Sequence, residues 1–508
     1  MNTFYITTPI YYVNDKPHIG HAYTTIACDI IARYNKLIGN DVYFLTGTDE
    51  HGQKVEKAAN AASLNPQEFV DKMSKNFQDL VSFLNCEISD FIRTTDSKHI
   101  KASQALWKKL LDNNQIYLSN YEGWYSVRDE AFYAENELTK KDDKFIAPSG
   151  AEVEWIKEES YFFKLSEWQD KLIDFYEKNP NAIKPQSRFN EVLSFIKGNL
   201  KDLSISRTTF KWGVPVPNND KHVMYVWIDA LCNYLTSIGY PDINNKNFKK
   251  YWPGLHVVGK DILRFHSVYW PAFLMAADLE PPAKVFAHGW WTNEGEKISK
   301  SLGNIIDPYE IVSKYGLDQI RFFLFREVPF GNDGDFSKES IAQRINADLS
   351  NNFGNLVQRI CSFINKNCNS TVSNFVNYND EDNKLITFSI NKFNKYGQYM
   401  NEQNIDKSLK EVFELLTETN IYVDKQAPWK LKKTNLERMN AVLFVALEII
   451  RRSSLLLFPI IPGSCEKVFS ILNIDKKDIT INDYQSIPSK PYKINETFPV
   501  FPRIDIND

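Results

Sequence analysis

The N-terminal stretch alternates strand and helix patterns, and this alternation limits the fold more than any other feature of the 508-residue chain. Residues 3–13 are rich in β-branched and aromatic side chains and predict a buried strand, and residues 41–52 predict a second strand. Between them, apolar residues recur at helical spacing from Ile19 until Gly39 supplies a stop signal. A strand, a helix and a strand in this order form a βαβ unit, which predicts a parallel sheet with a nucleotide-type crevice at its carboxyl edge.

Composition narrows the class of protein. With 43% hydrophobic and 14% aromatic residues, the chain can bury a large core and is not expected to be disordered. The net charge of −4 provides no global basic field, so a nucleic-acid partner would need a local patch. The six cysteines contain no Cys-x-x-Cys pair, which favours a reducing compartment.

The most apolar stretch, residues 441–458, is a candidate for a membrane span. It contains Glu448, Arg451 and Arg452, and a buried core helix explains such a pattern better than a span does. We therefore expect a cytoplasmic protein with no membrane partner.

The sequence NDKPHIGHAY, residues 14–23, places His18 and His21 at the start of the predicted helix. Free backbone N–H groups and the positive end of the helix dipole favour an anion there, and Gly20 lets a ligand approach the backbone. The local features leave phosphate handling, a structural turn and a metal site open. The metal interpretation is the weakest, because no matching Cys/His pair occurs elsewhere in the sequence.

A second stretch, GEKISKSLGN at residues 295–304, interleaves lysines with serines. On its own, such a charged run is usually a solvated basic loop. HIGH followed by KISKS, however, resembles the two signatures of class I aminoacyl-tRNA synthetases, with Ile298 at the position of the methionine in the KMSKS motif. The residues that this resemblance assigns to ATP binding are His18, Gly20, His21, Lys297, Ser299 and Lys300.

The resemblance also implies a mechanism. An amino-acid carboxylate attacks the α-phosphorus of ATP, pyrophosphate leaves, and negative charge shifts onto the phosphate oxygens. Positioning and fixed positive charge then matter more than a proton acceptor. The catalytic residues expected to supply this charge are His18, His21, Lys297 and Lys300, and Mg²⁺ is expected with the ATP.

Five stretches resemble methionyl-tRNA synthetases, and the resemblance runs along nearly the whole chain. The stretches are ITTPIYYVNDKPHIGH, GTDEHG, YVWIDALCNY, HVVGKDILRFHSVYWPAFL and AHGWW. The resemblance implies a methionine–tRNA ligase, which forms methionyl-adenylate and pyrophosphate and then transfers methionine to the terminal adenosine of its tRNA. The expected partners are methionine, ATP and the tRNA for methionine.

The same resemblance implies a methionine pocket. The residues that it assigns are Ile10, Tyr12, Asp49, Trp227, Ala230, Tyr234, Ile262 and His288. Asp49 would hold the ammonium group, and the other side chains would form a slot suited to an unbranched thioether. Without the resemblance, Trp227 and Tyr234 would be interpreted as core aromatics.

Residues 257–262, VVGKDI, predict a strand that ends in a polar turn at the carboxyl edge of the sheet. In the family that this chain resembles, Gly259 and Asp261 would lie beside the adenosine, with the carboxylate near the ribose hydroxyls. The alternative is that Asp261 caps a helix, and both roles could hold at once.

An insertion is expected between the two halves of the nucleotide fold, and in many relatives it carries a zinc knuckle. The corresponding positions here are Ser126, Asp129, Ile146 and Ser149, the last two aligned less surely. Because none is cysteine or histidine, we expect no zinc and a metal-free knuckle, with no metal ligands among the protein's site residues. The aromatics predicted to hold the knuckle are Trp124, Tyr125, Phe132 and Tyr133.

From about residue 339 the pattern becomes helical, which predicts an all-α domain. Asn355 and Arg359 lie four residues apart and therefore share a helix face, and Trp429 follows a proline in a basic setting. A solvated polar face and a packed tryptophan are the ordinary interpretations. The resemblance instead implies anticodon binding, in which Trp429 stacks on an unstacked base and the polar pair contacts base edges.

We therefore predict an α/β protein: a Rossmann-type parallel-sheet catalytic domain split by an insertion, followed by an all-α helical bundle that binds the anticodon. The predicted parts are residues 1–117 and 223–290 for the two catalytic halves, 118–222 for the insertion, 291–338 for the KISKS loop and stem-contact region, and 339–508 for the bundle and tail. A monomer is expected. The alternatives are a class I ligase for a branched amino acid, a protein that only binds tRNA, and a small-molecule nucleotidylyltransferase.

Overall fold

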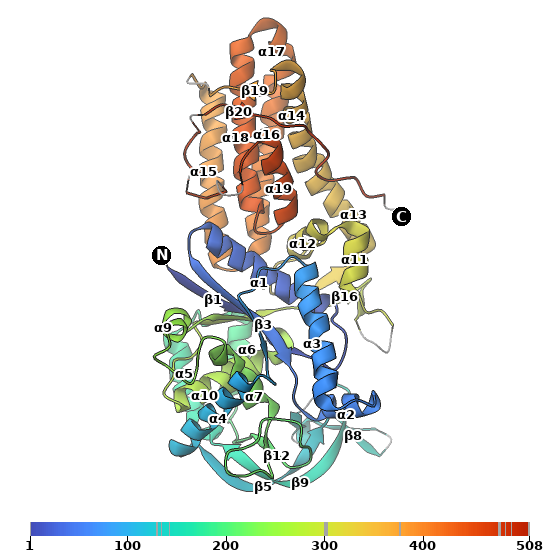
Figure 1. Ribbon diagram of the computed structural model, residues 1–508, viewed down its shortest axis with the longest axis vertical. Helices are drawn as coiled ribbons and strands as arrows, with labels where there is room; N and C mark the ends of the chain where they lie inside the picture. Colours follow the sequence, from blue (N-terminus) through green and yellow to red (C-terminus); the bar gives the residue numbers. More distant parts are fainter. Residues whose placement is uncertain are drawn as a thin grey trace. The chain divides into compact units, whose positions relative to one another are not determined.

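The computed structural model describes most of the chain, and its helices and strands are labelled in Figure 1. The described residues are 2–128, 131–133, 135–141, 143–298, 303–374, 377–475, 479–482, 484–488 and 490–505. The chain divides into two compact units. We call them the helical unit, comprising Met1–Asn2, His18–Val42 and Gly289–Asp508, and the sheet unit, comprising Thr3–Pro17 and Tyr43–His288.

The sheet unit is built on a parallel sheet. Its strand order is β10-β15-β14-β1-β3-β2, with β4 beside β3. The bounds are β1 Thr3–Thr7, β2 Tyr11–Tyr12, β3 Asp41–Asp49, β4 Asp90–Arg93, β10 Ile183–Lys184, β14 Leu255–Gly259 and β15 Lys284–His288. Five strand pairs run parallel, namely β1–β14, β14–β15, β10–β15, β2–β3 and β3–β4. The prediction of a parallel α/β sheet is confirmed.

The prediction of one continuous strand over residues 3–13 is wrong. The segment forms β1 and β2, which lie on opposite sides of β3, and Pro9 stands in the break between them. Proline cannot donate a ladder hydrogen bond, and the Thr8 hydroxyl donates to the Pro9 carbonyl oxygen over 2.8 Å. The chain can therefore leave one side of β3 and pair again on the other.

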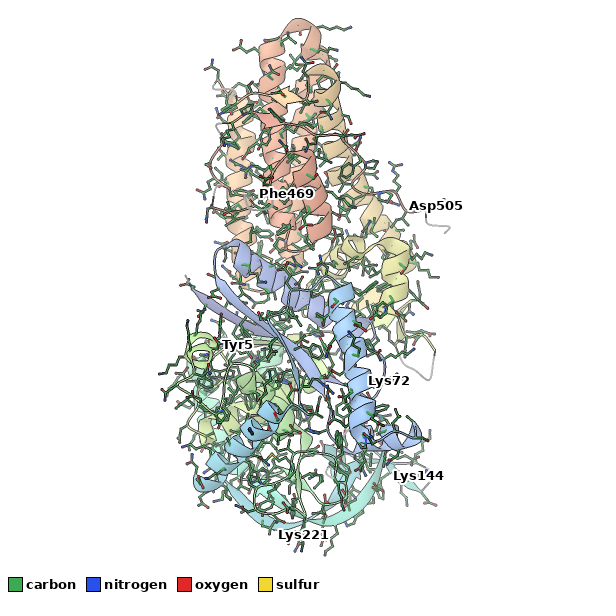
Figure 2. All side chains as sticks on the ribbon, in the orientation of Figure 1. Tyr5, Lys72, Lys144, Lys221, Phe469 and Asp505 are labelled. Atoms are coloured by element: carbon green, nitrogen blue, oxygen red, sulfur yellow. The ribbon has the colours of Figure 1, made fainter. Side chains whose placement is uncertain are left out.

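Helices cover this sheet and connect its strands. Their bounds are α2 Gln53–Ala61, α3 Pro66–Phe83, α4 Ser97–Asp112, α5 Gln169–Lys178, α6 Gln186–Lys197, α7 Val226–Leu231, α8 Asn233–Thr236, α9 Lys246–Tyr251 and α10 Trp270–Ala276. Tyr5 on β1, labelled in Figure 2, is buried against α8, and its hydroxyl donates to the Tyr234 carbonyl oxygen over 2.7 Å.

The predicted insertion contains a long antiparallel ribbon of β5, Ile116–Ser126, and β9, Glu152–Phe163. The other strands of this sheet are β6 Ala131–Tyr133, β7 Thr139–Lys141, β8 Lys144–Ile146 and β11 Leu203–Ser204, the last paired with β9. The ring of Trp124 lies 4.2 Å from that of Phe145 and 5.3 Å from that of Trp155, and Tyr125 is buried. Packed aromatics thus hold part of the knuckle, as predicted, although the side chain of Phe132 lies outside the described part.

The helical unit contains the predicted all-α bundle, in which α15, α16, α18 and α19 lie side by side (Figure 1). Their bounds are Asp380–Asn401, Ile405–Gln426, Leu436–Leu457 and Pro462–Ile471. Phe469, labelled in Figure 2, packs against Phe458 in its interior. Residues 441–458 lie mostly in buried α18, as predicted, and none of the helices in the described ranges has the length and apolarity needed to cross a membrane.

Several shorter elements complete the helical unit. Strands β17 Glu296–Lys297, β16 Trp291–Asn293 and β18 Gly334–Phe336 form a small sheet. The helices are α11 Pro308–Tyr315, α12 Leu317–Arg326, α13 Lys338–Arg344, α14 Asn355–Asn367 and α17 Pro428–Thr434, with a π-helical segment at Ile345–Gly354 and strands β19 Thr371–Val372 and β20 Tyr492–Lys493.

Helix α1, Ile19–Leu37, also belongs to the helical unit and is fixed there by a buried arginine. Arg321 on α12 is fully buried and donates to Asp29 Oδ2 over 2.6 Å. It also donates to the carbonyl oxygens of Pro459 and Ile460, in the turn that follows α18. A buried charge is stable only with such partners, so Arg321 links α1, α12 and the bundle.

Candidate active site and anticodon-binding residues

His18 and His21 cap the N-terminus of α1 reciprocally. His18 is the N-cap residue, and its Nδ1 accepts a hydrogen bond from the Gly20 N–H over 3.0 Å. His21 Nδ1 accepts from the His18 N–H over 3.0 Å, and the two ring centroids lie 4.0 Å apart. The two histidines therefore form a structural helix cap, and any role in binding phosphate must be compatible with that cap.

One detail of the predicted phosphate site is corrected. The first backbone N–H groups of α1 are not free: Ile19 donates to the Ile306 carbonyl oxygen over 3.1 Å, and Gly20 and His21 both donate to His18. The pKa values of the two histidines favour neutral rings over charged ones. Burial lowers the pKa of His18, and burial together with the neighbouring His18 holds the pKa of His21 well below its ordinary value.

Neutral rings have a definite tautomer here. Because Nδ1 of each histidine accepts a backbone N–H, its single proton must be on Nε2. Both side chains therefore act as N–H donors. Gly20 is required between them, because a Cβ at that position would come within 2.9 Å of His18 Cε1.

The second signature belongs to the same compact unit as the first. Strand β17 ends at Lys297 and pairs with β16, and Ile306 contacts the start of α1 through the hydrogen bond described above. Ser299, Lys300 and the side chain of Lys297 lie outside the described part of the structure. Their predicted role stays a prediction.

Four of the predicted methionine-pocket residues meet in the sheet unit. Ile10, Tyr12 and Trp227 pack against Ala230 in one small apolar cluster. Asp49, 7% exposed at the end of β3, stands opposite Tyr12 in the parallel pair of β2 and β3. The ring of Trp227 stacks on Phe265 with centroids 3.5 Å apart.

Tyr234 and Ile262 are joined through His266, a residue that the sequence interpretation missed. His266 Nε2 lies 2.7 Å from the Tyr234 hydroxyl, and its Nδ1 lies 2.9 Å from the Ile262 carbonyl oxygen. The carbonyl can only accept, so Nδ1 carries the proton and Tyr234 donates to Nε2. Burial lowers the pKa of His266 to about 4, which keeps this ring neutral.

Gly259 and His288 end two adjacent strands, where they are register partners in the β14–β15 pair. Asp261 lies inside the following 3₁₀ turn, Lys260–Ile262, whose N-cap is Gly259, so the helix-cap alternative for Asp261 is wrong. A Cβ at Gly259 would come within 2.5 Å of Asp261 Oδ1. Glycine is therefore needed to let this exposed carboxylate fold back against the strand end.

A second missed group consists of His51, His99 and Asp229. His51 Nδ1 lies 2.7 Å from Asp229 Oδ2, and His99 Nε2 lies 2.8 Å from Asp229 Oδ1. The His–Asp pairs are 178 and 130 residues apart in the sequence, so local patterns carry no signal for them. The GTDEHG stretch contained His51, but the sequence interpretation assigned a role only to Asp49 within it.

The predicted anticodon residues lie on the surface of the helical unit. Arg359 Nη1 donates to Asp424 Oδ1 over 2.8 Å, and its Nη2 donates to Asn420 Oδ1 over 3.2 Å. Its guanidinium carbon lies 6.0 Å from the ring centroid of Trp429, and that ring is 41% exposed. Asn355 is exposed at the start of α14. An exposed aromatic face beside a held arginine suits an unstacked base.

Comparison with known protein families matches almost the whole chain. The family described as "tRNA synthetases class I (M)" matches residues 4–361. The family described as "Anticodon binding domain of methionyl tRNA ligase" matches residues 372–490.

Relatives and solved structures agree with these families. The methionine–tRNA ligase of Rickettsia felis is 55% identical over 94% of this chain and 93% of its own length, and that of Mesorhizobium japonicum is 49% identical over 98% and 97%. The Mycobacterium tuberculosis methionyl-tRNA synthetase in complex with methionyl-adenylate superimposes with a TM-score of 0.97 at 44% identity, covering 99% of this chain and 100% of that chain.

A class I synthetase fold and a matching anticodon-binding domain therefore occur in one chain. The chain belongs to the methionyl-tRNA synthetase family. Its activity is that of a methionine–tRNA ligase, an ATP-dependent enzyme that activates methionine as the adenylate and then transfers it to tRNA. The prediction of function is confirmed.

Proposed function

We propose that His18 and His21 act on the phosphates of ATP as neutral hydrogen-bond donors through Nε2–H. The observation that carries this proposal is the reciprocal cap, which fixes both rings by Nδ1 and leaves the proton on Nε2. A fixed donor stabilises charge that develops on a phosphate oxygen without reorganising. Lys297 and Lys300 then supply the positive charge, Gly20 lets the nucleotide approach, and Ser299 binds it beside the lysines.

Methionine binding is proposed for residues of the sheet unit. Asp49 binds the ammonium group, and its low exposure strengthens that ion pair. The aromatic and aliphatic cluster around Ala230 encloses the thioether, and Tyr234, Ile262 and His288 complete the pocket. Gly259 and Asp261 bind the adenosine, with the carboxylate accepting from the ribose hydroxyls.

Anticodon recognition is proposed for Asn355, Arg359 and Trp429. Trp429 offers an exposed ring for base stacking, and the two polar side chains contact base edges. The ion pair with Asp424 holds Arg359 in one orientation, which reduces the entropy lost when RNA binds.

Magnesium is proposed to enter with ATP rather than in a protein cage. Within the described ranges, no group of three His, Cys, Asp or Glu residues could hold a metal ion. Mg²⁺ commonly binds through substrate phosphates and retains several waters, so such a group is not required.

Zinc does not fit the residues of the knuckle. Ser149 accepts hydrogen bonds from Arg128 Nη2 at both its carbonyl oxygen, over 2.6 Å, and its hydroxyl oxygen, over 2.9 Å. A guanidinium occupies the oxygens that a dication would need, and Ile146 has no donor atom at all. We propose that this arginine contact ties the knuckle in place of a metal.

The test is amino-acid-dependent ATP–pyrophosphate exchange, with each proteinogenic amino acid, on metal-stripped protein resupplied with magnesium only. Exchange with methionine alone is expected. Exchange with a branched amino acid would overturn the pocket assignment. Loss of exchange that zinc restores would overturn the zinc-free knuckle, and loss that zinc does not restore, with tRNA binding intact, would favour a protein that only binds tRNA.

The proposal includes a monomeric enzyme that acts in the cytoplasm. Sedimentation velocity at several concentrations tests the first part, because a monomer gives one concentration-independent species. Fractionation of cells that express the chain tests the second.

A further inference from the structure

Asp229 is a fully buried carboxylate held by two histidines from distant parts of the sheet unit. Each carboxylate oxygen has its own partner, His51 for Oδ2 and His99 for Oδ1. His99 is itself fully buried on α4 and contacts the hydroxyls of Ser103 and Thr236. None of the proposed binding or catalytic roles uses this group, although burying a carboxylate charge costs folding free energy.

The placement of Asp229 suggests its purpose. It lies on α7 between Trp227 and Ala230, which are proposed to enclose the methionine side chain. His51 follows Asp49 by two residues, and its carbonyl oxygen accepts a hydrogen bond from the Tyr12 hydroxyl over 2.9 Å. The Asp229–His51 hydrogen bond therefore joins the element that carries one wall of the proposed pocket to the element that carries the other.

The charge of Asp229 opposes separation of the two elements that the Asp229–His51 hydrogen bond joins. Burial alone would raise the pKa of Asp229, but the charge and hydrogen bond of His51 and the hydrogen bond of His99 lower it to about 2. The carboxylate is therefore ionised at neutral pH. Separating it from either histidine would leave a buried charge with too few donors, which is costly. His51 is also fixed from its other side, because its ring packs edge-on against Trp212.

We propose that Asp229 is a positioning residue, which sets through His51 the distance between Asp49 and Tyr12 on one side and Trp227 and Ala230 on the other. The proposal rests on the pocket assignment of the proposed function. A narrow slot distinguishes a thioether from its rivals only if its walls keep their spacing, and small misplacements of binding groups are expensive in rate and affinity.

The test compares Asp229→Asn with the native enzyme in ATP–pyrophosphate exchange. The amide keeps one acceptor oxygen but removes the charge, and its nitrogen faces a histidine ring nitrogen that must give up its proton to accept, so the charged hydrogen bonds of the network are lost. We expect the KM for methionine to rise by about 10- to 100-fold, while the KM for ATP changes by less than about twofold.

A second pair of variants tests the His51 arm alone. His51→Ala removes the donor and is expected to raise the KM for methionine as Asp229→Asn does. His51→Asn places an amide nitrogen near the position of Nδ1 and is expected to restore most of the affinity. A merely structural role would not produce this rescue. The pair also keeps the proposal testable if Asp229→Asn does not fold.

Two controls distinguish a positioning role of Asp229 from a general loss of stability and from a wrong pocket assignment. Glu411→Gln makes the same carboxylate-to-amide change at a buried position in the bundle, where Glu411 contacts Lys392 over 2.7 Å, and is expected to lower stability without changing the KM for methionine. Asp49→Asn tests the pocket assignment itself, because it should raise the KM for methionine whether or not Asp229 positions anything.

The outcomes are distinct. A rise in the KM for methionine in Asp229→Asn and His51→Ala, with rescue in His51→Asn, supports the proposal. An unchanged KM for methionine in both variants, with the effect of Asp49→Asn intact, overturns the positioning role alone. An unchanged KM in Asp49→Asn as well overturns the pocket assignment. Parallel rises in the KM values for methionine and ATP would also overturn the proposal, because they indicate general damage.

Discussion

The helical unit and the sheet unit divide the proposed functional residues by their chemistry. Both signatures and the proposed anticodon residues belong to the helical unit, where donors and cations are proposed to bind phosphates and bases. The proposed methionine and adenosine residues belong to the sheet unit, where buried hydrogen-bond networks lie beside a small apolar cluster. The proposals therefore assign different strategies to the two units: directed donors for charge in one, and fixed spacing for shape in the other.

The exposure of key side chains reflects this difference. Trp429 in the helical unit is 41% exposed, whereas Asp229 and His266 in the sheet unit are 0% and 2% exposed. Exposed side chains can contact a ligand directly, while buried side chains act by fixing the position of the side chains to which they are hydrogen-bonded. We therefore expect variants in the helical unit to change kcat or tRNA use, and variants in the sheet unit to change methionine binding or stability.

The largest effect is expected for His21→Asn. The amide oxygen can accept the His18 N–H as Nδ1 does, so the cap survives, but the Nε2–H donor is lost. Removal of one such donor typically lowers kcat by about 100- to 1,000-fold, and the KM for methionine should change little.

His21→Gln is the matched variant. Its amide nitrogen lies near the position of Nε2, and glutamine at the third helical position can also accept the N-cap N–H, so it should be more active than His21→Asn at similar stability. Steady-state exchange and thermal unfolding measure the two quantities. Full activity of His21→Asn would show that His21 acts only as a cap.

Trp429→Ala tests the RNA-facing part of the helical unit. Loss of base stacking costs about 1–3 kcal/mol, so kcat/KM for tRNA should fall by about 5- to 150-fold. Exchange without tRNA should not change, and Trp429→Phe, which keeps a ring, should retain much of the tRNA activity. An equal fall in exchange would indicate damage beyond the anticodon site.

The pH dependence of stability tests the buried histidines of the sheet unit. Burial lowers the pKa of His266 to about 4, whereas the ordinary pKa of histidine is about 6.5. Between these two pH values the unfolded chain therefore binds more protons than the folded chain. Stability is therefore full above about pH 6.5 and decreases as pH falls to about 4, by up to about 3 kcal/mol for this group.

His266→Asn is the matched variant for this pH effect. It keeps the donor to the Ile262 carbonyl and cannot titrate, so it should reduce the loss of stability towards acid. Burial also lowers the pKa of His256, which remains and preserves part of the slope. Urea midpoints measured at several pH values give the result, and an unchanged slope in His266→Asn would contradict the buried neutral ring.

The smallest effect is expected for Arg128→Ala in the knuckle of the sheet unit. Loss of the hydrogen bonds to Ser149 at an exposed site should cost less than about 1 kcal/mol and leave exchange intact. Lys75→Ala, which removes an exposed ion pair with Asp79, is the control for a surface change. A chelator should not alter the unfolding temperature of either variant, and a large drop would contradict the zinc-free knuckle.

Sequence patterns predicted local structure well because local structure has local causes. Helix α1 ends at Leu37, and Gly39 adopts a positive φ of 87°, as its stop signal required. The break at Pro9 was missed because the apolar run on both sides of it hides a short interruption. The π-helical segment Ile345–Gly354 was also missed, since its apolar spacing resembles that of an α-helix.

The site was only partly accessible to sequence analysis. Its members could be assigned through family resemblance, and the structure brings Ile10, Tyr12, Trp227 and Ala230 into one cluster. Protonation states and long-range partners could not be assigned, because they depend on burial and on contacts between distant segments. The neutral His18 and the Asp229 network both belong to this second kind of information.

The proposed division assigns methionine binding to the sheet unit and phosphate chemistry to the helical unit. Its most direct test is equilibrium binding of labelled methionine in the absence of ATP. Asp49→Asn should weaken binding by about 10- to 100-fold, because a charged hydrogen bond to the ammonium is lost. His21→Asn should bind methionine as the native enzyme does, since its donor acts on phosphate. Equal losses in the two variants, or native binding by Asp49→Asn, would contradict the assignment of methionine to the sheet unit and of phosphate chemistry to the helical unit.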